Sequence, residues 1–400
     1  MRALIKEKGF EYLVYGLLLS LFFSKAIPNI FLGVLFIWKM IDFKSIKKTK
    51  SVFFFSSAFI LFVLLFFLTF KAIISGTLND NFKMYKGLAL CFLIAAIFQN
   101  IEDVKKFKTV ILFGINAAVS ASLFLIGLYF FQHHTLPFSN TAQVNELLIL
   151  ERPYIGFISV LGFFLACEKV VNKESFKRLW ILNAIVLFLF ILLISARISI
   201  ITMFLIAVIY LLFYSKIGGY KKAASLISFI ILFGIIVLTN KNISERFFIK
   251  NNIEESLRVA SDYEPRIVIW KCASGMTNQH NFNPLFGFEG YKTIEENFLD
   301  CYAETIENQS KKEYFLEEQF NSHNQFIDLF LIGGVIAFGL FCAFFIKLFI
   351  EVRKQFFQTA IMVSFLLFFC VENIFYRQFG CYLFGIFVLF LAHRNQEINE

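Results

Sequence analysis

Long apolar runs separated by short polar connections constrain this chain more than any other feature of its sequence. A helix needs about 20 mostly apolar residues to cross roughly 30 Å of hydrocarbon, and twelve stretches approach that length. We predict spans near residues 10–25, 27–43, 52–74, 87–100, 109–131, 154–171, 179–195, 198–214, 223–240, 324–350, 357–373 and 379–393. The sequence therefore predicts an all-α polytopic membrane protein with about twelve transmembrane helices.

Composition agrees with a chain embedded in lipid. Hydrophobic residues make up 58% of the sequence and charged residues 17%, and Phe alone occurs 58 times. A soluble domain is usually about 45–50% apolar and about 25% charged. The first span is followed by further spans without a small-residue cleavage site, so we expect no removable signal peptide.

Basic residues gather in alternate connections and so indicate orientation. The connections "KSIKKTK", "IEDVKKFK", "NKESFKR", "SKIGGYKK" and "EVRKQF", with residues 1–9 and Arg394, hold nineteen Lys and Arg, against seven in the opposite short loops. The positive-inside rule places the nineteen, and both termini, in the cytoplasm. The net charge of +9 is therefore mostly a topology signal, and we expect no nucleic-acid partner.

The apolar stretch 179–214 is interrupted only by "SARIS". As a single helix it would be about 54 Å long, which is too long for one crossing. Basic connections flank it on both sides, so the chain must cross the membrane an even number of times between them. We predict a tight hairpin with Arg197 at its outer turn, although neither Gly nor Pro marks that turn.

One large hydrophilic segment, residues 241–322, lies on the outer side between the ninth and tenth helices. It holds nine Lys and Arg against fourteen Asp and Glu, so individual arginines would have to attract an anionic ligand. We expect short amphipathic helices here, with a turn near "NFNPLFGFEG". Cys272 and Cys301 could pair if that space is oxidising, or stay two free thiols. The other five cysteines lie in spans as small apolar residues.

Three polar features share the outer side: Arg197, Arg266 and the pair His323-Asn324. A guanidinium binds phosphate oxygens through bidentate, charge-assisted hydrogen bonds. A neutral imidazole can accept a proton from a hydroxyl near pH 7. Two arginines and a histidine suit transfer from a pyrophosphate leaving group to a hydroxyl acceptor. Phosphate-loop, dinucleotide-binding, HExxH and CxxC motifs are missing, so we expect no cofactor and no metal.

For the remaining polar residues on the outer side, the sequence leaves two roles open in each case. Arg152, in "LERPYIGF", could line a substrate path or anchor the chain at the interface. Glu372 and Arg377, in "VENIFYRQFG", could pair with each other, or Glu372 could orient one of the arginines. Asn324 could orient His323 or cap the following helix.

Roughly residues 150–390 resemble the superfamily of O-antigen ligases and polymerases of the bacterial envelope. The resemblance rests on "SAR" (195–197), "RIVIW" (266–270), "NPLFGFEG" (283–290) and "SHNQFIDLFLIGG" (322–334). The ligase pattern is His, then Asn, Ser or Gln, nine residues, Gly, two residues, then Gly, Thr or Tyr. His323, Asn324 and Gly334 match it, whereas Ala337 departs from it, which leaves ligase or polymerase open. Gly334 is expected to allow close helix packing.

The resemblance implies a GT-C-like glycosyltransferase that uses a polyprenyl-diphosphate-linked glycan as donor and needs no metal. Its essential residues map onto Arg197, Arg266 and His323, with Arg152, Asn324, Glu372 and Arg377 as candidates for substrate binding. Residues 1–150 would hold the first five helices and residues 151–400 the ligase- or polymerase-like region. The acceptor would be a lipid A core, another lipid-linked glycan or a protein, at the periplasmic face of the inner membrane. A transporter of lipid-linked glycans is the competing function.

Overall fold

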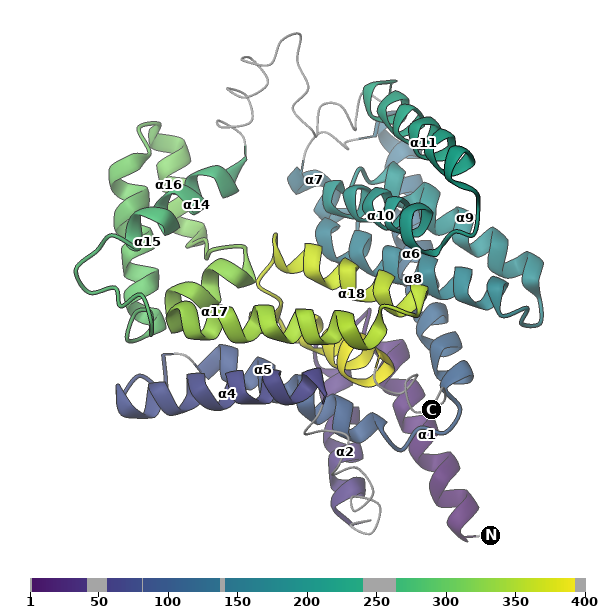
Figure 1. Ribbon diagram of the computed structural model, residues 1–400, viewed down its shortest axis with the longest axis horizontal. Coiled ribbons are helices and arrows are strands. Elements are labelled where there is room, and N and C mark those ends of the chain that lie inside the picture. Colours follow the sequence, from purple (N-terminus) through teal and green to yellow (C-terminus); the bar gives the residue numbers. More distant parts are fainter. Residues whose placement is uncertain (1, 42–55, 81, 137–140, 240–263, 393–400) are drawn as a thin grey trace. The chain divides into compact units, whose positions relative to one another are not determined.

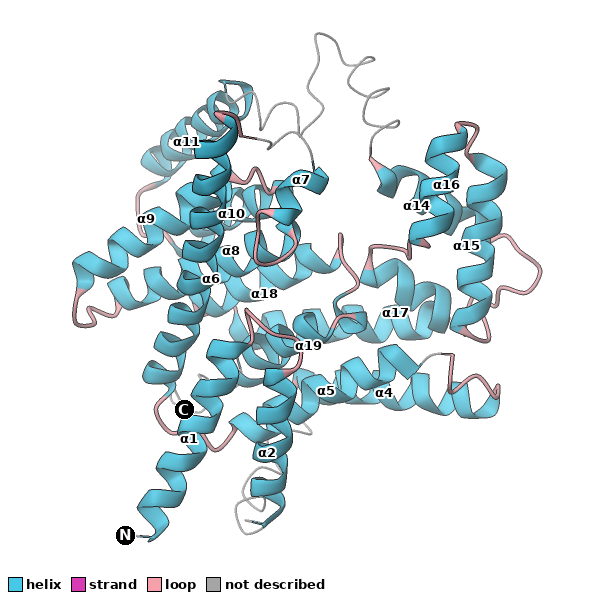
Figure 2. Ribbon diagram, turned by 180° about the vertical axis from the view of Figure 1, so that it is seen from behind, coloured by secondary structure: helices cyan, strands magenta, loops and turns pink. Residues whose placement is uncertain are grey.

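The computed structural model describes residues 2–41, 56–80, 82–136, 141–239 and 264–392, which are mostly helical with short loops between the helices (Figures 1 and 2). The β structure among them is one isolated bridge between Asn283 and Gly287. A helix overlaps each predicted span, with different bounds in several cases: α1 (Arg2–Ser20), α2 (Ile27–Ile41), α4 (Ser57–Ile74), α5 (Phe82–Phe98), α6 (Val104–His133), α8 (Arg152–Val171), α9 (Lys177–Leu193), α10 (Arg197–Ile209), α11 (Gly219–Thr239), α17 (Gln325–Val352), α18 (Phe356–Phe369) and α19 (Gln378–Phe384).

Six of these helices are long and apolar enough to cross a membrane: α4, α6, α8, α10 with its extension η2 (Tyr210–Tyr214), α11 and α17. The all-helical class and the membrane character are thereby confirmed. The number of crossings and the side on which each loop lies stay predictions. The basic connection 44–50 and Arg394 lie outside the described residues.

The chain forms two compact units by its internal packing. The first unit contains residues 1–43, 97–256 and 354–364, and the second contains residues 44–96, 257–353 and 365–400. These two units are defined by contacts between residues. The division of the chain into residues 1–150 and 151–400 was based on the resemblance, and it stays a prediction.

In the first unit, α8 is the central helix. It packs against α6, α9 and α10, and most of its side chains are buried. The short helix α7 (Thr141–Glu146) precedes it. The break between α9 and α10 falls at residues 194–196, directly before the predicted turn residue Arg197, which is the first residue of α10. Whether the two helices form a membrane hairpin stays a prediction. Ser195 makes the turn with a φ of 49°, a left-handed conformation that the sequence did not signal.

In the second unit, phenylalanines fill the core. Phe341 and Phe344 of α17 contact rings from α18, from the turn η3 (Ile374–Tyr376) and from α19, which continues as the π-helical η4 (Gly385–Leu391). Helix α4 packs against α17 (Figure 1). The two run antiparallel: Ser57, at the start of α4, donates its N–H and hydroxyl to Glu351 at the end of α17, and Lys71, near the end of α4, donates to Ile332 O.

Helix α17 is interrupted at Gly334, whose φ of 60° and ψ of −158° are accessible mainly to glycine. The loop 283–290, which contains the predicted turn, satisfies the backbone groups that the break releases. Phe288 N–H donates to Leu331 O (2.8 Å), Val335 N–H to Pro284 O (2.9 Å), and Lys71 Nζ to Phe288 O and Ile332 O. A Cβ at Gly334 would lie 2.3 Å from Leu285 C and O. The expected close approach at Gly334 is thus made to a loop, not to a helix.

The hydrophilic segment 241–322 contains the predicted short helices, α14 (Pro265–Met276), α15 (Tyr291–Thr305) and α16 (Gln309–Glu318). Its first part, residues 241–263, lies outside the described residues. Of the two alternatives for Cys272 and Cys301, the structure has the disulfide, which joins α14 to α15. Helices α15 and α16 pack together, and α15 also contacts α17.

Candidate functional site

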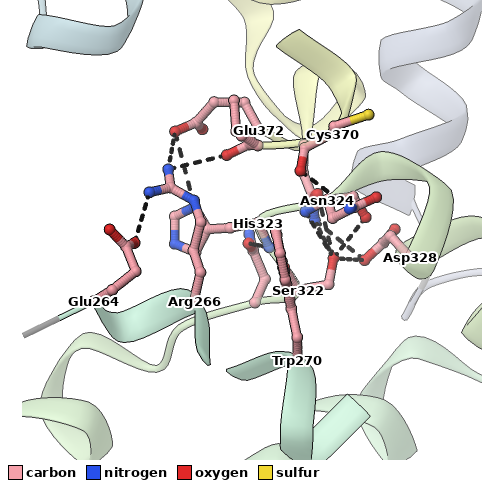
Figure 3. A network of polar contacts seen from close by, with 12 residues as sticks. Glu264, Arg266, Trp270, Ser322, His323, Asn324, Asp328, Cys370 and Glu372 are labelled. Carbon is pink, nitrogen blue, oxygen red and sulfur yellow. Dashed lines mark hydrogen bonds and ion pairs between the residues drawn. The ribbon is translucent and has the colours of Figure 1, made fainter. Parts of the chain in front are cut away.

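The candidate site lies within the second unit, where α14, the segment before α17 and the end of α18 meet (Figure 3). Arg266 stands in the first turn of α14, directly after Pro265 at the helix start. Its guanidinium Nη1 donates to Glu264 Oε1 (3.1 Å), and Nη2 donates to Val371 O (3.1 Å) and Glu372 Oε1 (3.4 Å). The side chain is 23% exposed. Arg266 is therefore held in a fixed position while part of it stays accessible.

His323 precedes α17 and adopts a left-handed backbone conformation with a φ of 43°. Asn321 accepts a hydrogen bond from the His323 N–H (3.0 Å), which supports this unusual turn. The imidazole is 21% exposed, and its Nδ1 lies 3.9 Å from Glu372 Oε1. That distance fits an ion pair but is too long for a hydrogen bond. The turn thus directs the imidazole toward Glu372.

Glu372 is the residue that Arg266 and His323 share. It lies just after α18, and its side chain is only 6% exposed. The sequence left two partners open for it, and the structure has the pair with Arg266. With Glu264, two carboxylates face one guanidinium, so the cluster carries excess negative charge when the imidazole is neutral.

Asn324 caps α17. Its side-chain oxygen accepts from the N–H groups of Phe326 (2.9 Å) and Ile327 (3.2 Å), and its amide donates to Cys370 O (3.0 Å). The capping alternative from the sequence is therefore confirmed. The bond to Cys370 also ties the start of α17 to the segment that carries Glu372.

A buried polar layer lies behind the cluster, and sequence reasoning missed it. Asp328, fully buried, accepts bonds from Ser322 Oγ (3.3 Å), Asn373 Nδ2 (3.2 Å) and Tyr376 Oη (2.8 Å). Burial and the adjacent Asp328 carboxylate raise the pKa of Tyr376 well above its ordinary value, so this phenol stays a donor. The signal was available, since an acidic residue inside an apolar span is costly and needs partners.

Within the part of the chain that the structure describes, two buried polar atoms of the cluster lack hydrogen-bond partners, Arg266 Nε and His323 Nδ1. Buried polar atoms are normally satisfied, so each marks a place where a ligand or a rearranged side chain can bond. The arrangement offers a guanidinium donor for an anion, an imidazole for a proton, and a carboxylate within reach of both. Among the described residues, His, Cys, Asp and Glu form no group of three suited to a metal ion.

Arg152 and Arg197 belong to the first unit. Arg152 is 2% exposed at the start of α8, where its N–H donates to Asn145 Oδ1 (3.1 Å). A Cβ at Gly156, one turn further along α8, would lie 2.7 Å from Ala196 Cβ, so α8 and α10 approach closely beside Arg197. Arg197 itself is half-buried. The structure thus brings the helix starts that carry these two arginines together.

Arg377 lies in the second unit with Glu372, directly after η3. Its side chain is exposed, and its N–H donates to Ile374 O (3.1 Å). Glu372 pairs with Arg266, and a role of Arg377 in substrate binding stays a prediction.

A comparison with protein-family models matches residues 182–342 to the family described as O-antigen ligase. The match covers less than half of the chain and includes Arg197, Arg266 and His323, whereas Arg152, Glu372 and Arg377 lie outside it. None of the curated proteins matches the chain. The match indicates an enzyme of the ligase or polymerase type that acts on glycans at a membrane. Residues 182–342 of this chain are therefore similar to the O-antigen ligase family, which agrees with the resemblance seen in the sequence.

Proposed function

We propose that this protein transfers a glycan from a polyprenyl-diphosphate carrier to a hydroxyl acceptor. The observation that carries the proposal is the cluster of Arg266, Glu372 and His323 at the start of α17, with unsatisfied nitrogens on Arg266 and His323. A lipid-linked donor keeps its diphosphate near the membrane surface, where residues at the end of a membrane helix can reach it. The O-antigen ligase match supports the same chemistry.

In the proposed reaction, the bond between the anomeric carbon and a diphosphate oxygen breaks as the acceptor oxygen bonds to that carbon. The acceptor's proton passes to His323, which later releases it to solvent. The departing lipid diphosphate gains a negative charge, and Arg266 stabilises that charge through its N–H donors. The transfer needs no nucleotide sugar, because the diphosphate carrier is itself the leaving group.

The double engagement of Arg266 by Glu264 and Glu372 has a mechanistic consequence. A diphosphate can occupy the guanidinium only by displacing at least one carboxylate. We propose that Glu372 is displaced and moves to His323, because its Oε1 already lies 3.9 Å from Nδ1. There it would hold the proton on Nδ1, leave Nε2 as the base and stabilise the imidazolium that forms.

The remaining candidates enter the proposal through the resemblance. Arg197 would also serve the donor's diphosphate, with Arg152 and Arg377 binding donor or acceptor. An arginine suits this role better than a lysine, because its planar fork matches phosphate oxygens bidentately. Asn324 would act indirectly, since its side chain is occupied in capping α17.

The proposed location is the bacterial inner membrane, with both termini in the cytoplasm and the 241–322 segment in the periplasm. Two observations support it. The basic residues are concentrated in the connections assigned to the cytoplasm. The disulfide between Cys272 and Cys301 is of a kind that persists in oxidising compartments.

The proposed acceptor is a lipid A core, with a growing lipid-linked O-antigen or capsule glycan as the alternative. A transporter of lipid-linked glycans is the second candidate, because α17 is interrupted and interrupted helices occur at transporter substrate sites. The backbone groups at this break are bonded to the chain's own loop 283–290 and to Lys71. That internal satisfaction favours the enzyme.

Reconstitution distinguishes these functions. The purified protein is placed in liposomes with a polyprenyl-diphosphate-linked glycan, and lipid A core is added in one reaction and omitted in another. A ligase yields glycan joined to the core, and a polymerase yields longer glycan still linked to polyprenyl diphosphate without any core. Movement of donor between leaflets with no covalent product would identify a transporter and overturn the proposal.

A further inference from the structure

We propose that Asp328 is a positioning residue that holds the segment carrying His323 in register with the segment carrying Glu372. This inference rests on the proposed function for its catalytic meaning, while its structural claim can be tested without activity. Asp328 lies one turn inside α17 and is fully buried, and its carboxylate bonds to Ser322, Asn373 and Tyr376.

The bonds of Asp328 reach the residues next to both functional groups. Its Oδ1 accepts from Ser322, which immediately precedes His323, and from Asn373, which immediately follows Glu372. Ser322 and Asn373 also bond directly, with Asn373 Nδ2 donating to Ser322 Oγ at 3.0 Å. One buried carboxylate oxygen therefore binds together two segments that lie about fifty residues apart in sequence.

The second carboxylate oxygen holds the far side of the same turn. Tyr376 Oη donates to Asp328 Oδ2 at 2.8 Å, and Tyr376 ends η3, the turn that follows Glu372 and Asn373. The carboxylate thus fixes the 372–376 segment at two points. Three donors converge on one acceptor group, which explains why an acidic residue can be fully buried here.

The conformation of His323 makes such support necessary. A non-glycine residue with a φ of 43° is in a sparsely populated region that persists only where its surroundings hold it. Local bonds to Asn321 and Asn324 shape the turn. The bonds of Ser322 to Asp328 and Asn373 anchor it against the 372–376 segment, together with the bonds from Asn324 Nδ2 to Cys370 O and from Phe375 N–H to Gln325 Oε1 on the α17 side. Loss of Asp328 should therefore displace the imidazole relative to Glu372.

Histidine modification measures that displacement directly. The folded protein in detergent is treated with diethyl pyrocarbonate, and the modification rates of His323 and His280 are followed by peptide mass spectrometry. His280 is exposed in the same outer segment and serves as an internal reference. In Asp328→Ala, we expect the modification rate of His323 relative to His280 to rise about fivefold or more. One lost hydrogen bond is worth about 1 kcal/mol net, which raises the population of the displaced imidazole by about that factor.

Two further variants sharpen the test. Asp328→Asn keeps one acceptor for Ser322 and Asn373, so its relative rate should fall between those of the parent and Asp328→Ala. Glu351→Gln makes the same acid-to-amide change at the other end of α17, where Glu351 binds Ser57, and should leave the ratio unchanged. If Asp328→Ala does not fold, Ser322→Ala, which removes the hydroxyl that Asp328 binds, carries the same expectation.

An unchanged ratio in Asp328→Ala, or equal acceleration at both histidines, would overturn the proposal. With active enzyme, the variant should lower kcat and leave the donor KM nearly unchanged, and it should add no further loss to His323→Ala. Additive losses would mean that Asp328 does not act through His323. If the parent protein transfers no glycan, the proposed function fails, while the modification ratio still decides whether Asp328 positions His323.

Discussion

Replacing Gly334 with alanine should undock the loop 283–290 from α17. The φ of 60° and ψ of −158° at this position cost a non-glycine residue about 1–3 kcal/mol. The added Cβ would lie 2.3 Å from Leu285 C and O and 2.6 Å from Phe286 N, so the loop backbone must move. That movement breaks the bonds from Val335 N–H to Pro284 O and from Ile336 N–H to Leu285 O.

Each buried backbone group left unpaired costs about 1–3 kcal/mol. Strain and two lost bonds together give a destabilisation of roughly 3 kcal/mol or more. For a unit of this size, about 2–4 °C of melting temperature correspond to 1 kcal/mol, so thermal unfolding in detergent should begin roughly 6 °C lower or more.

Gly339→Ala is the matched control, because it makes the same change in the same helix where a Cβ would meet nothing within 4 Å. It should be neutral or slightly stabilising, since alanine favours helix by about 1 kcal/mol over glycine. A Gly334→Ala protein as stable as the parent and as Gly339→Ala would refute the proposed role of the break.

Three further predictions address charge, covalent linkage and sidedness. Arg266→Lys and Arg197→Lys should each lower the transfer rate more than tenfold, or roughly 1.4 kcal/mol of transition-state binding, in detergent assays with lipid-diphosphate donor, and the double variant should lose less than the sum of the two. A parental rate for Arg266→Lys would remove this residue from the site. Serine at both positions of the Cys272–Cys301 pair, which closes a separation of 29 residues, should destabilise the outer helices by about 3–4 kcal/mol, measured as faster limited proteolysis, and parental resistance would contradict this. Single cysteines at 264–322 in an otherwise cysteine-free variant should react with an impermeant thiol reagent in outer-permeabilised cells, whereas cysteines at 215–222 should not; outside labelling of 215–222 would overturn the hairpin at Arg197.

The helices were predictable because apolar length and loop charge are local properties of the sequence. The even number of crossings expected between two basic connections predicted a turn at Arg197, and the helices break directly before that residue, at 194–196. The interruption of α17 was not predictable in the same way, because hydropathy continues through Gly334. The groups that satisfy it come from Lys71 and from the loop 283–290, far away in sequence.

The residue types of the candidate site were visible in the sequence, whereas their pairing was not. Two arginines and a histidine suggested a diphosphate site, and that assignment stays a prediction. The pairing of Glu372 with Arg266 depends on tertiary contacts. Asp328 was not predicted as a functional residue, because the ligase pattern includes His323 and Asn324 but not position 328. Its cost within an apolar span was the available signal.

The most direct test of the account is single-turnover glycan transfer by His323→Ala beside His280→Ala. Each variant removes one histidine, and His280 is exposed in the 241–322 segment and takes no part in the proposed reaction. His280→Ala should transfer glycan at the parental rate. His323→Ala, folded and inserted in the membrane, should retain only the small residual rate that arginine stabilisation of the leaving diphosphate supports. Near-parental transfer by His323→Ala would contradict the assignment of His323 as the base.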